Sequence, residues 1–398
     1  MINSVSGYGS TGSICVDIAE ELEKQGHECF IAYGQVKKGY PKVYKIGTVL
    51  ENHLHNIGSR VFGKQGYFTK SGTKKLVKFI KDYDPDIIHL HNLHGNYLNL
   101  EILFDFFLKI QKPIVWTLHD CWAFTGKCAH YTNVSCYKWK NECNSCPQVH
   151  QYPASLFLDR SKTMFYDKKK WFNYIKKTSI ITVSNWLNEQ LGESFLKFHK
   201  NETIYNWVDH ETFTLNFETS FIEGLGLDIK KFTVLLVSAS WYSNDNKTDD
   251  AINLADKLGS NYQVVLVGNL KIKRNIPKNI ITIPYVDGKS ELAQLYAFSN
   301  VYVHLSTEDT FGLVIAEALS CGTPAIVYNS TACPEIIDES CGFVTEIRNI
   351  DQIVDCIDLV QKNGKQFYSD NARKRVVENF DIKRNIRATI DVYKNSLS

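Results

Sequence analysis

The sequence predicts an α/β fold made of two doubly wound domains, each with a parallel sheet between layers of helices. Three observations support this prediction. The chain has 398 residues, more than one hydrophobic core usually organises. Short runs of β-branched and aromatic residues alternate with amphipathic stretches, as in parallel sheets covered by helices. Residues 301–328 follow the order strand, polar loop, apolar helix, strand, which is half of such a sheet.

The composition is that of an ordinary soluble globular protein, with 44% hydrophobic and 22% charged residues. Lys plus Arg total 45 and Asp plus Glu 43, and this balance argues against nucleic-acid binding driven by bulk charge. No apolar run reaches the roughly 20 residues of a membrane span, and no signal peptide opens the chain. We therefore expect a cytoplasmic protein whose 11 cysteines are reduced thiols or metal ligands.

The first domain is expected to open with a strand of which only residues 1–3 are present, so either the strand is short or the chain begins upstream. A glycine-rich turn at 6–12 leads into an amphipathic helix at 13–25, which Gly26 ends. A turn between strand and helix can cradle phosphate, but such a turn alone is weak evidence. Further elements follow in order: strands at 28–33, 86–91 and 112–118, and at 179–187 a strand with the start of a helix capped by Ser184-Asn185.

Two lysine-rich stretches raise the question of whether the protein contacts a membrane surface. Residues 64–81 contain six lysines and no acid, interleaved with apolar residues. A basic amphipathic helix of this kind is typical of a segment that lies on an anionic membrane surface. A solvated lysine face on an ordinary helix explains the same pattern. A second basic stretch, 167–177, slightly favours peripheral contact with a membrane.

Five cysteines fall within 26 residues: Cys121, Cys128, Cys136, Cys143 and Cys146. Cys143 and Cys146 have the spacing of a half-site for tetrahedral zinc, and Cys128 with Cys136 would supply two more thiolates across a wider gap of seven residues. The loop at 121–153 has little regular pattern and would otherwise be costly to order. A structural zinc site is therefore predicted, with free thiols as the alternative and a disulfide disfavoured by the compartment.

The second domain is expected to contain strands at 232–240, 263–268 and 280–286 and a helix at 287–300, before the strand at 301–306. The polar loop that follows leads to Phe311-Gly312-Leu313, where a helix begins. Free N–H groups around Thr310 to Leu313 would point out of the helix N-terminus, and Gly312 lets a ligand approach the backbone closely. Ligands bind at the carboxyl ends of parallel strands, so the sequence predicts an anion site here.

Two acids, Asp309 and Glu317, lie eight positions apart, one at the mouth of this helix and the other about two turns in, near the same face. A buried carboxylate without partners is costly. A ribose diol would supply two hydroxyl donors to Glu317. A structural arginine or backbone groups would satisfy it equally well.

The string 304–324 as a whole resembles the acid-seven-acid motif of the retaining glycosyltransferases of family 4, S-x-x-E-G-F-G-x-x-x-x-E-A-x-x-x-G-x-P. The matching positions are Ser306, Phe311, Gly312, Glu317, Ala318, Gly322 and Pro324. Asp309 replaces the usual Glu, which leaves the donor sugar open. Residues 203–213 are similar to the interdomain crossing I-x-N-G-V-D-x-x-x-F, with Trp207 in place of Gly, and 117–120 are similar to T-x-H-D.

This resemblance covers nearly the whole chain and implies the GT-B architecture of two facing, Rossmann-like domains. Residues 1–205 would form the acceptor domain and 206–375 the nucleotide-sugar domain, with a C-terminal helix at 376–398 crossing back to the first. Enzymes of this kind act in bacterial capsule and exopolysaccharide synthesis. The implied reaction is transfer of a hexosyl unit from a nucleoside-diphosphate sugar, with UDP favoured, to a hydroxyl of a lipid-linked glycan at the inner membrane face. It retains anomeric configuration and requires no divalent metal.

The resemblance also implies residue roles. Asp309 would contact the transferred sugar, His119 the donor sugar or phosphate, and Glu317 the ribose. Lys247 would grip the diphosphate together with the helix N-terminus and Arg274, because Ser240 or Trp241 fills the family's arginine position. The other donor-binding positions are Thr310, Phe311, Gly312 and Leu313 for the diphosphate, Tyr285 and Val286 for the base, and Gly9 and Gly12 along the interdomain cleft.

Three other functions remain open. A nucleotide-sugar epimerase would share the fold. A dinucleotide-binding oxidoreductase would need G-x-G-x-x-G after a complete strand and an acid about 20 residues further on. The turn at 6–12 follows a truncated strand, and Glu28 is the only nearby acid at that distance. A non-catalytic protein scaffolded by zinc would not need Asp309 and Glu317 on one helix face.

Overall fold

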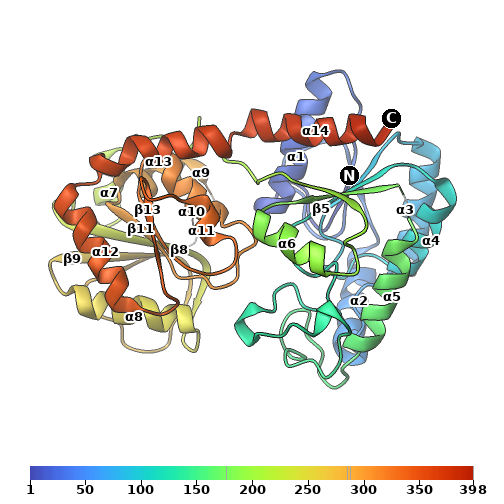
Figure 1. Ribbon diagram of the computed structural model, residues 1–398, viewed down its shortest axis with the longest axis horizontal. Coiled ribbons are helices and arrows are strands. Elements are labelled where there is room, and N and C mark those ends of the chain that lie inside the picture. Colours follow the sequence, from blue (N-terminus) through green and yellow to red (C-terminus); the bar gives the residue numbers. More distant parts are fainter. Residues whose placement is uncertain (176, 285, 287, 398) are drawn as a thin grey trace. The chain divides into compact units, whose positions relative to one another are not determined.

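The computed structural model describes residues 1–175, 177–284, 286 and 288–397 (Figure 1). The chain divides into two compact units, Met1–Ile204 with Ile386–Ser398, and Tyr205–Asn385. The first division lies one residue from the boundary expected from the sequence. Among the described helices, none combines the length and the apolar character needed to cross a bilayer.

Unit 1, the first of these two, is built on a seven-stranded parallel sheet of order β3-β2-β1-β4-β5-β6-β7. Its strands are β1 (Ile2–Asn3), β2 (Ile31–Tyr33), β3 (Val43–Lys45), β4 (Ile88–Leu90), β5 (Ile114–Leu118), β6 (Thr178–Thr182) and β7 (Lys200–Thr203). The first strand, β1, has two residues in this sequence and pairs with both β2 and β4.

The helices of unit 1 surround this sheet (Figure 1). They are α1 (Gly9–Lys24), α2 (Val49–Phe62), α3 (Lys70–Tyr83), α4 (Leu100–Ile110), α5 (Ser161–Asn173), α6 (Asn185–Glu193) and the last part of α14 (Ile382–Leu397), with the short 3-10 turns η1 (Thr132–Val134) and η2 (Lys138–Lys140). Helix α1 begins four residues before the predicted start at Ser13, so the predicted glycine turn is shorter than expected. The predicted cap of α6 is confirmed, because the Ser184 hydroxyl accepts the Leu187 N–H at 3.1 Å.

Unit 2, residues 205–385, contains a six-stranded parallel sheet of order β10-β9-β8-β11-β12-β13. The strands are β8 (Phe232–Tyr242), β9 (Tyr262–Lys271), β10 (Ile280–Ile283), β11 (Val301–His304), β12 (Ala325–Tyr328) and β13 (Gly342–Thr345). The helices are α7 (Thr219–Gly224), α8 (Asn246–Leu258), α9 (Lys289–Phe298), α10 (Leu313–Ser320), α11 (Cys333–Ile336), α12 (Ile350–Asn363) and α13 (Gln366–Asn379).

Both sheets have the doubly wound order, which confirms the predicted fold class of two Rossmann-like α/β domains. The strand order reverses between β1 and β4 in unit 1 and between β8 and β11 in unit 2. In unit 2 the core is formed by apolar side chains of the central strands, such as Leu236, Leu266 and Val303, which are almost fully buried. Parallel strands covered on both faces are continuously apolar, which is why the sequence predicts them well.

The predicted C-terminal helix at 376–398 is not continuous. Helix α13 ends at Asn379 and α14 begins at Ile382. The Phe380 side chain is fully buried at the break, and the Phe380 carbonyl accepts the Val208 N–H at 3.0 Å. The Asp381 carboxylate then accepts the Arg384 N–H at 2.8 Å, so it caps the new helix. Residues from Ile386 onward belong to unit 1.

The second predicted basic surface is partly wrong. Lys168 of α5 is fully buried and donates hydrogen bonds to the carbonyl oxygens of Trp122 at 2.6 Å and Thr125 at 3.1 Å. It cannot contribute to a membrane-facing patch. In the first basic stretch, Leu76 and Ile80 of α3 are buried in unit 1 and five of the lysines, at 70, 74, 75, 78 and 81, are exposed.

Candidate active site

The donor-side candidates of unit 2 lie at the carboxyl ends of β8 and β11, the two neighbouring strands between which the sheet order reverses. Ligands of doubly wound sheets bind in the crevice outside such a pair of strand ends. The loop after β11 carries Asp309 and leads into α10. The loop after β8 leads into α8, whose first turn carries Lys247.

Helix α10 begins with a free N-terminus. Gly312 occupies its N-cap position with a left-handed φ of 88°, and the Gly312 carbonyl accepts the Ile315 N–H at 2.9 Å. Within the described residues, the N–H groups of Gly312, Leu313 and Val314 have no hydrogen-bond acceptor. Such groups carry partial positive charge and bind anions. The preceding Phe311 is buried, with ring contacts to Phe380 at 5.3 Å and Tyr205 at 6.0 Å, and this fixes the entry of the chain into α10.

Replacing Gly312 with alanine is expected to lower the free energy of unfolding by about 1–3 kcal/mol, because φ is positive there. The new methyl group would also lie 2.7 Å from Cδ1 of Ile315 and displace the helix N-terminus, so nucleotide affinity should fall as well. Gly364→Ala is the matched control, since Gly364 has a φ of 81° and open space around its Cβ position. Chemical denaturation and calorimetric titration with UDP check both effects. Equal UDP affinity in the two variants would contradict the role of the α10 N-terminus.

Asp309 is held in place by a buried histidine. The Asp309 Oδ2 atom lies 2.7 Å from Nε2 of His304, and Nδ1 of His304 lies 2.9 Å from the Tyr302 hydroxyl. The Asp309 N–H also donates to the Thr331 hydroxyl at 3.1 Å. The His304 side chain is only 6% exposed, whereas the Asp309 side chain is 33% exposed. The buried histidine therefore holds the Asp309 carboxylate in position while leaving it accessible from outside. This role of His304 was not predicted from the sequence, although a histidine that ends a strand just before an acidic loop is a usable signal.

Glu317 lies in the second turn of α10 and is half-buried. Burial raises the pKa of Glu317 to about 7, while Lys289 and the Tyr296 hydroxyl lower it by smaller amounts. The Tyr296 hydroxyl donates to Oε2 of Glu317 at 3.4 Å. Among the residues that the structure describes, no arginine and no backbone N–H satisfies this carboxylate, so the structural alternative considered for it is not realised. The group therefore keeps acceptor capacity for a ligand.

Lys247 extends from the first turn of α8 toward the end of β8. Its Nζ donates to the Ser238 hydroxyl at 2.5 Å and to the Ser240 carbonyl at 3.3 Å, and lies 5.1 Å from the Trp241 ring centroid. A β-bulge between Val237 and Ser240 brings these oxygens to the lysine. Lys247 is also 3.7 Å from the Asp245 carboxylate, and its side chain is 23% exposed.

The other residues predicted to contact the diphosphate or the base have the following surroundings. Trp241, at or beside the family's arginine position, is almost fully buried and donates its indole N–H to the Val267 carbonyl at 3.0 Å, so it serves the core. Arg274 is paired with Asp249. Of the two predicted base-contacting residues, Val286 is half-buried after β10, and Tyr285 lies outside the described residues.

The candidates of unit 1 gather at the carboxyl ends of β4 and β5. His119 follows β5, and its Nε2 lies 3.0 Å from Nδ1 of His91, which follows β4. Burial lowers the pKa of His119 to about 4 and lowers that of His91 well below its usual range. Both imidazoles are therefore neutral near pH 7, and they act as hydrogen-bonding groups without a positive charge.

A second chain of polar groups lies beside His119. Nε2 of His94 is 2.7 Å from Oδ2 of Asp120, and Nδ1 of His94 is 2.8 Å from the Tyr152 hydroxyl. Burial disfavours ionisation of Asp120, but attraction and hydrogen bonding from His94 lower its pKa to about 2. His94 and Tyr152 were not predicted from the sequence, because their contacts join residues that are 26 and 58 positions apart.

The two predicted cleft glycines have different surroundings. A Cβ atom at Gly12 would lie 3.1 Å from the Gly7 nitrogen and from Cγ2 of Val5. The tight packing of the turn therefore favours a glycine at this position. Gly9 opens α1 with a φ of 62° and has open space around its Cβ position. Gly9 leaves room for a ligand, and the predicted cleft role of both glycines remains a prediction.

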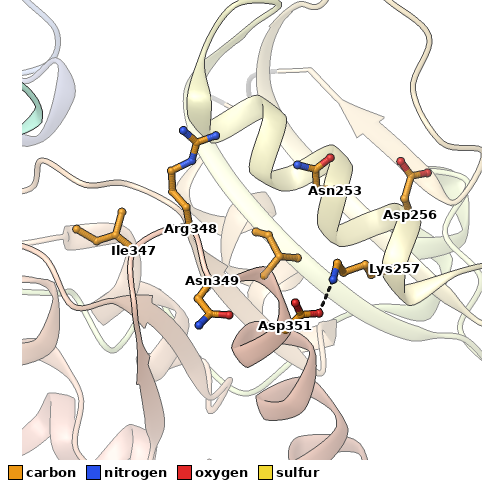
Figure 2. Close-up of a pocket in the computed structure, with 8 residues that line it drawn as sticks. Asn253, Asp256, Lys257, Ile347, Arg348, Asn349 and Asp351 are labelled. Atoms are coloured by element: carbon orange, nitrogen blue, oxygen red, sulfur yellow. Dashed lines mark hydrogen bonds and ion pairs between the residues drawn. The ribbon is translucent and has the colours of Figure 1, made fainter.

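A surface groove in unit 2 is separate from these residues (Figure 2). It has a volume of about 590 Å³ and lies between α8 and the start of α12. Lys257 and Asp351 point toward each other across it and form an ion pair (Figure 2). None of the predicted donor-binding residues that the structure describes lines this groove, so it is not the candidate active site.

Comparison with known proteins gives the family. Residues 11–212 match the model of Glycosyltransferase Family 4, and residues 228–380 match that of Glycosyl transferases group 1. An Escherichia coli protein named as a glycosyl transferase of colanic acid biosynthesis is 24% identical over 87% of this chain and 86% of its own. The N-acetyl-alpha-D-glucosaminyl L-malate synthase of Bacillus anthracis is 22% identical over 95% of this chain and 92% of its own.

Solved structures share the fold. A glycosyltransferase from Rickettsia africae aligns with a TM-score of 0.69 at 16% identity, over 100% of this chain and 97% of that one. An Anabaena protein solved with UDP-glucose aligns with a TM-score of 0.66 at 14% identity, over 99% and 98% of the two chains. Together with the family model that spans half of the sequence, these likenesses confirm the predicted family and fold: the chain belongs to glycosyltransferase family 4.

Proposed function

We propose that this glycosyltransferase transfers a hexosyl unit from a nucleoside-diphosphate sugar, with UDP as the nucleotide, to a hydroxyl of a glycan acceptor, with retention of anomeric configuration. The observation that carries the proposal is the pairing of free N–H groups at the start of α10 with a half-buried, under-satisfied Glu317 in the second turn of the same helix. The free N–H groups suit a diphosphate, and the Glu317 carboxylate suits the hydroxyl pair of a ribose.

The remaining candidates take roles around that pair. Lys247 neutralises charge on the departing diphosphate, where it develops in the transition state. Asp309, oriented by His304, accepts a hydrogen bond from a donor-sugar hydroxyl. His119 supplies a neutral hydrogen-bonding group from unit 1. No step in this scheme requires a divalent metal at the donor, so adding magnesium or manganese ions should leave the rate of transfer unchanged.

Support for the nucleotide and the acceptor comes from related proteins. The Anabaena structures contain UDP and UDP-glucose, which favours UDP. Two Mycobacterium tuberculosis relatives named as GDP-mannose-dependent enzymes match 29% of this chain at 27% identity, which makes GDP the second candidate. The colanic acid relative favours an acceptor in surface polysaccharide synthesis. The exposed lysines of α3 suit contact with an anionic membrane that would present a lipid-linked acceptor.

UDP is expected to raise the melting temperature of the full chain, and NAD is expected to leave it unchanged. A ligand at about 100 times its Kd stabilises the folded state by about 2.7 kcal/mol, which is several degrees for domains of this size. Thermal unfolding with UDP, GDP, their sugar conjugates and NAD makes the comparison. A shift with NAD alone would favour the oxidoreductase. Conversion of the sugar nucleotide without any acceptor would favour the epimerase.

A further inference from the structure

The loop at 121–153 of unit 1 brings four cysteines, spread over positions 128 to 146, to one small cavity. The cavity has a volume of about 20 Å³, which is room for a single water-sized guest. Cys128, Cys136, Cys143 and Cys146 all line it. The fifth cysteine of the stretch, Cys121, does not line it. All are free thiols.

The sulfur geometry suits a shared metal better than a disulfide. The Sγ atoms of Cys128 and Cys146 lie 4.0 Å apart, whereas a disulfide needs about 2.05 Å. With zinc–sulfur bonds of about 2.3 Å, the edge of a tetrahedral site is about 3.8 Å. The Gly126 N–H also donates to Sγ of Cys143 at 3.1 Å, as amides do toward thiolates. In the described chain no three of these sulfurs lie within 4.8 Å of one another, so metal binding would draw at least one thiol inward.

Buried lysines beside the cavity are a second, independent observation. Lys127 lines the cavity and is 5% exposed, and its Nζ donates only to carbonyl oxygens, those of Gln148, Val149 and Gln151. Lys168 is fully buried and donates to the carbonyl of Thr125, which also lines the cavity. Within the described residues, the hydrogen bonds of both ammonium groups go to carbonyl oxygens and none goes to a carboxylate, although burying such a cation without a counter-charge is costly. Zinc with four thiolates carries two negative charges and would balance both lysines.

We propose that the loop at 121–153 binds one zinc ion through the thiolates of Cys128, Cys136, Cys143 and Cys146. Four soft thiolates, two of them in a C-x-x-C pair, are the ligand set of a closed structural zinc site. The loop starts immediately after Asp120 and returns Tyr152 to His94, which binds Asp120. The metal therefore fixes both ends of the polar chain that lies beside His119.

Metal analysis of the full-length protein tests the proposal. The purified chain should contain about one zinc per molecule, and Cys143→Ser and Cys146→Ser should each lower this to less than about one fifth. Cys356→Ser is the control, because Cys356 is a half-buried thiol on α12 in unit 2 and should leave the zinc content unchanged. Chelation should make the 121–153 loop sensitive to limited proteolysis, and zinc should restore its protection.

A measurement on the parent protein avoids dependence on variants that fail to fold. Cobalt added to chelator-treated protein should give thiolate-to-cobalt charge-transfer absorption and the ligand-field bands of a tetrahedral site. Absence of these bands, together with zinc below about a tenth of an equivalent after reconstitution, would overturn the proposal. Equal zinc in the Cys143 and Cys356 variants would overturn it too. So would a count of two fewer than the 11 thiols in denatured, unreduced protein, because it would indicate a disulfide.

Discussion

Replacing Lys247 with alanine is expected to lower kcat by about 10²–10³ while leaving the fold intact. Its ammonium group lies at the carboxyl end of β8, where Trp241 serves the core, and the other candidate cation, Arg274, is paired with Asp249. It is held by two uncharged oxygens, those of Ser238 and Ser240, with Asp245 farther away at 3.7 Å. A diphosphate leaving group would therefore meet a positioned and incompletely compensated charge. Initial rates of sugar transfer at saturating donor measure the effect.

The matched control is Lys257→Ala. Lys257 lies on the same helix, α8, but it pairs with Asp351 across the groove that is separate from the candidate site (Figure 2). We expect its kcat to match the parent. Lys247→Arg should recover part of the lost rate, because the charge is restored with a different shape. If the alanine variant retained more than about a third of the parent kcat, the leaving-group role of Lys247 would be excluded.

The sheet strands were predictable where burial is complete. The strands β8, β9, β11 and β12 are covered by helices on both faces, so their sequences are apolar throughout. Three strands escaped prediction, and all three are sheet edges: β3 and β7 in unit 1 and β13 in unit 2. The sequence of β7 is Lys-Asn-Glu-Thr, with most of its side chains exposed. An edge strand needs no continuous apolar pattern, and its charges discourage pairing with other chains.

The site was predictable along one stretch of chain and unpredictable across strands. Asp309, Gly312 and Glu317 lie in one loop and helix, so their spacing alone places them together. The partner of His119 is His91, which reaches it from the neighbouring strand. Lys168 sits in a stretch of three consecutive lysines with nothing to mark it as buried, and only the fold places it under the loop that follows β5. Local sequence patterns locate individual site residues, whereas the residues that contact them depend on the register between neighbouring strands.

Replacing Glu317 with glutamine is expected to weaken UDP binding by roughly 10- to 100-fold, because hydrogen bonds to a charged acceptor contribute about 1.5–3 kcal/mol each. Glutamine keeps the size of the side chain and one acceptor oxygen but loses the charge. Glu291→Gln on α9 is the control, since Glu291 is exposed on a neighbouring helix. Calorimetric titration with UDP measures both variants. Parent-like affinity in Glu317→Gln would remove the ribose assignment.

The pH dependence of the parent gives a signature that a structural role for Glu317 would not produce. Burial raises the pKa of this carboxyl from 4.5 to about 7, so the folded chain holds its proton more tightly than the unfolded chain. The contribution of Glu317 to stability is therefore fully present below pH 4.5 and is lost as the pH rises toward 7. Ribose hydroxyls donate hydrogen bonds to the ionised form, so UDP affinity should rise as the pH increases through about 7 and level off above it.

The groups that face Glu317 are Lys289, Tyr296, Tyr302 and Cys321. Burial raises the pKa of Cys321 to about 12 and raises the pKa of each of the two tyrosines well above its usual range, so these three stay neutral in this window. In Glu317→Gln the pH dependence of stability and the pH dependence of UDP affinity should both become flatter. UDP affinity that is constant between pH 6 and 8 in the parent would mean that the nucleotide binds without this carboxylate, and the α10 assignment would then rest on its free N–H groups alone.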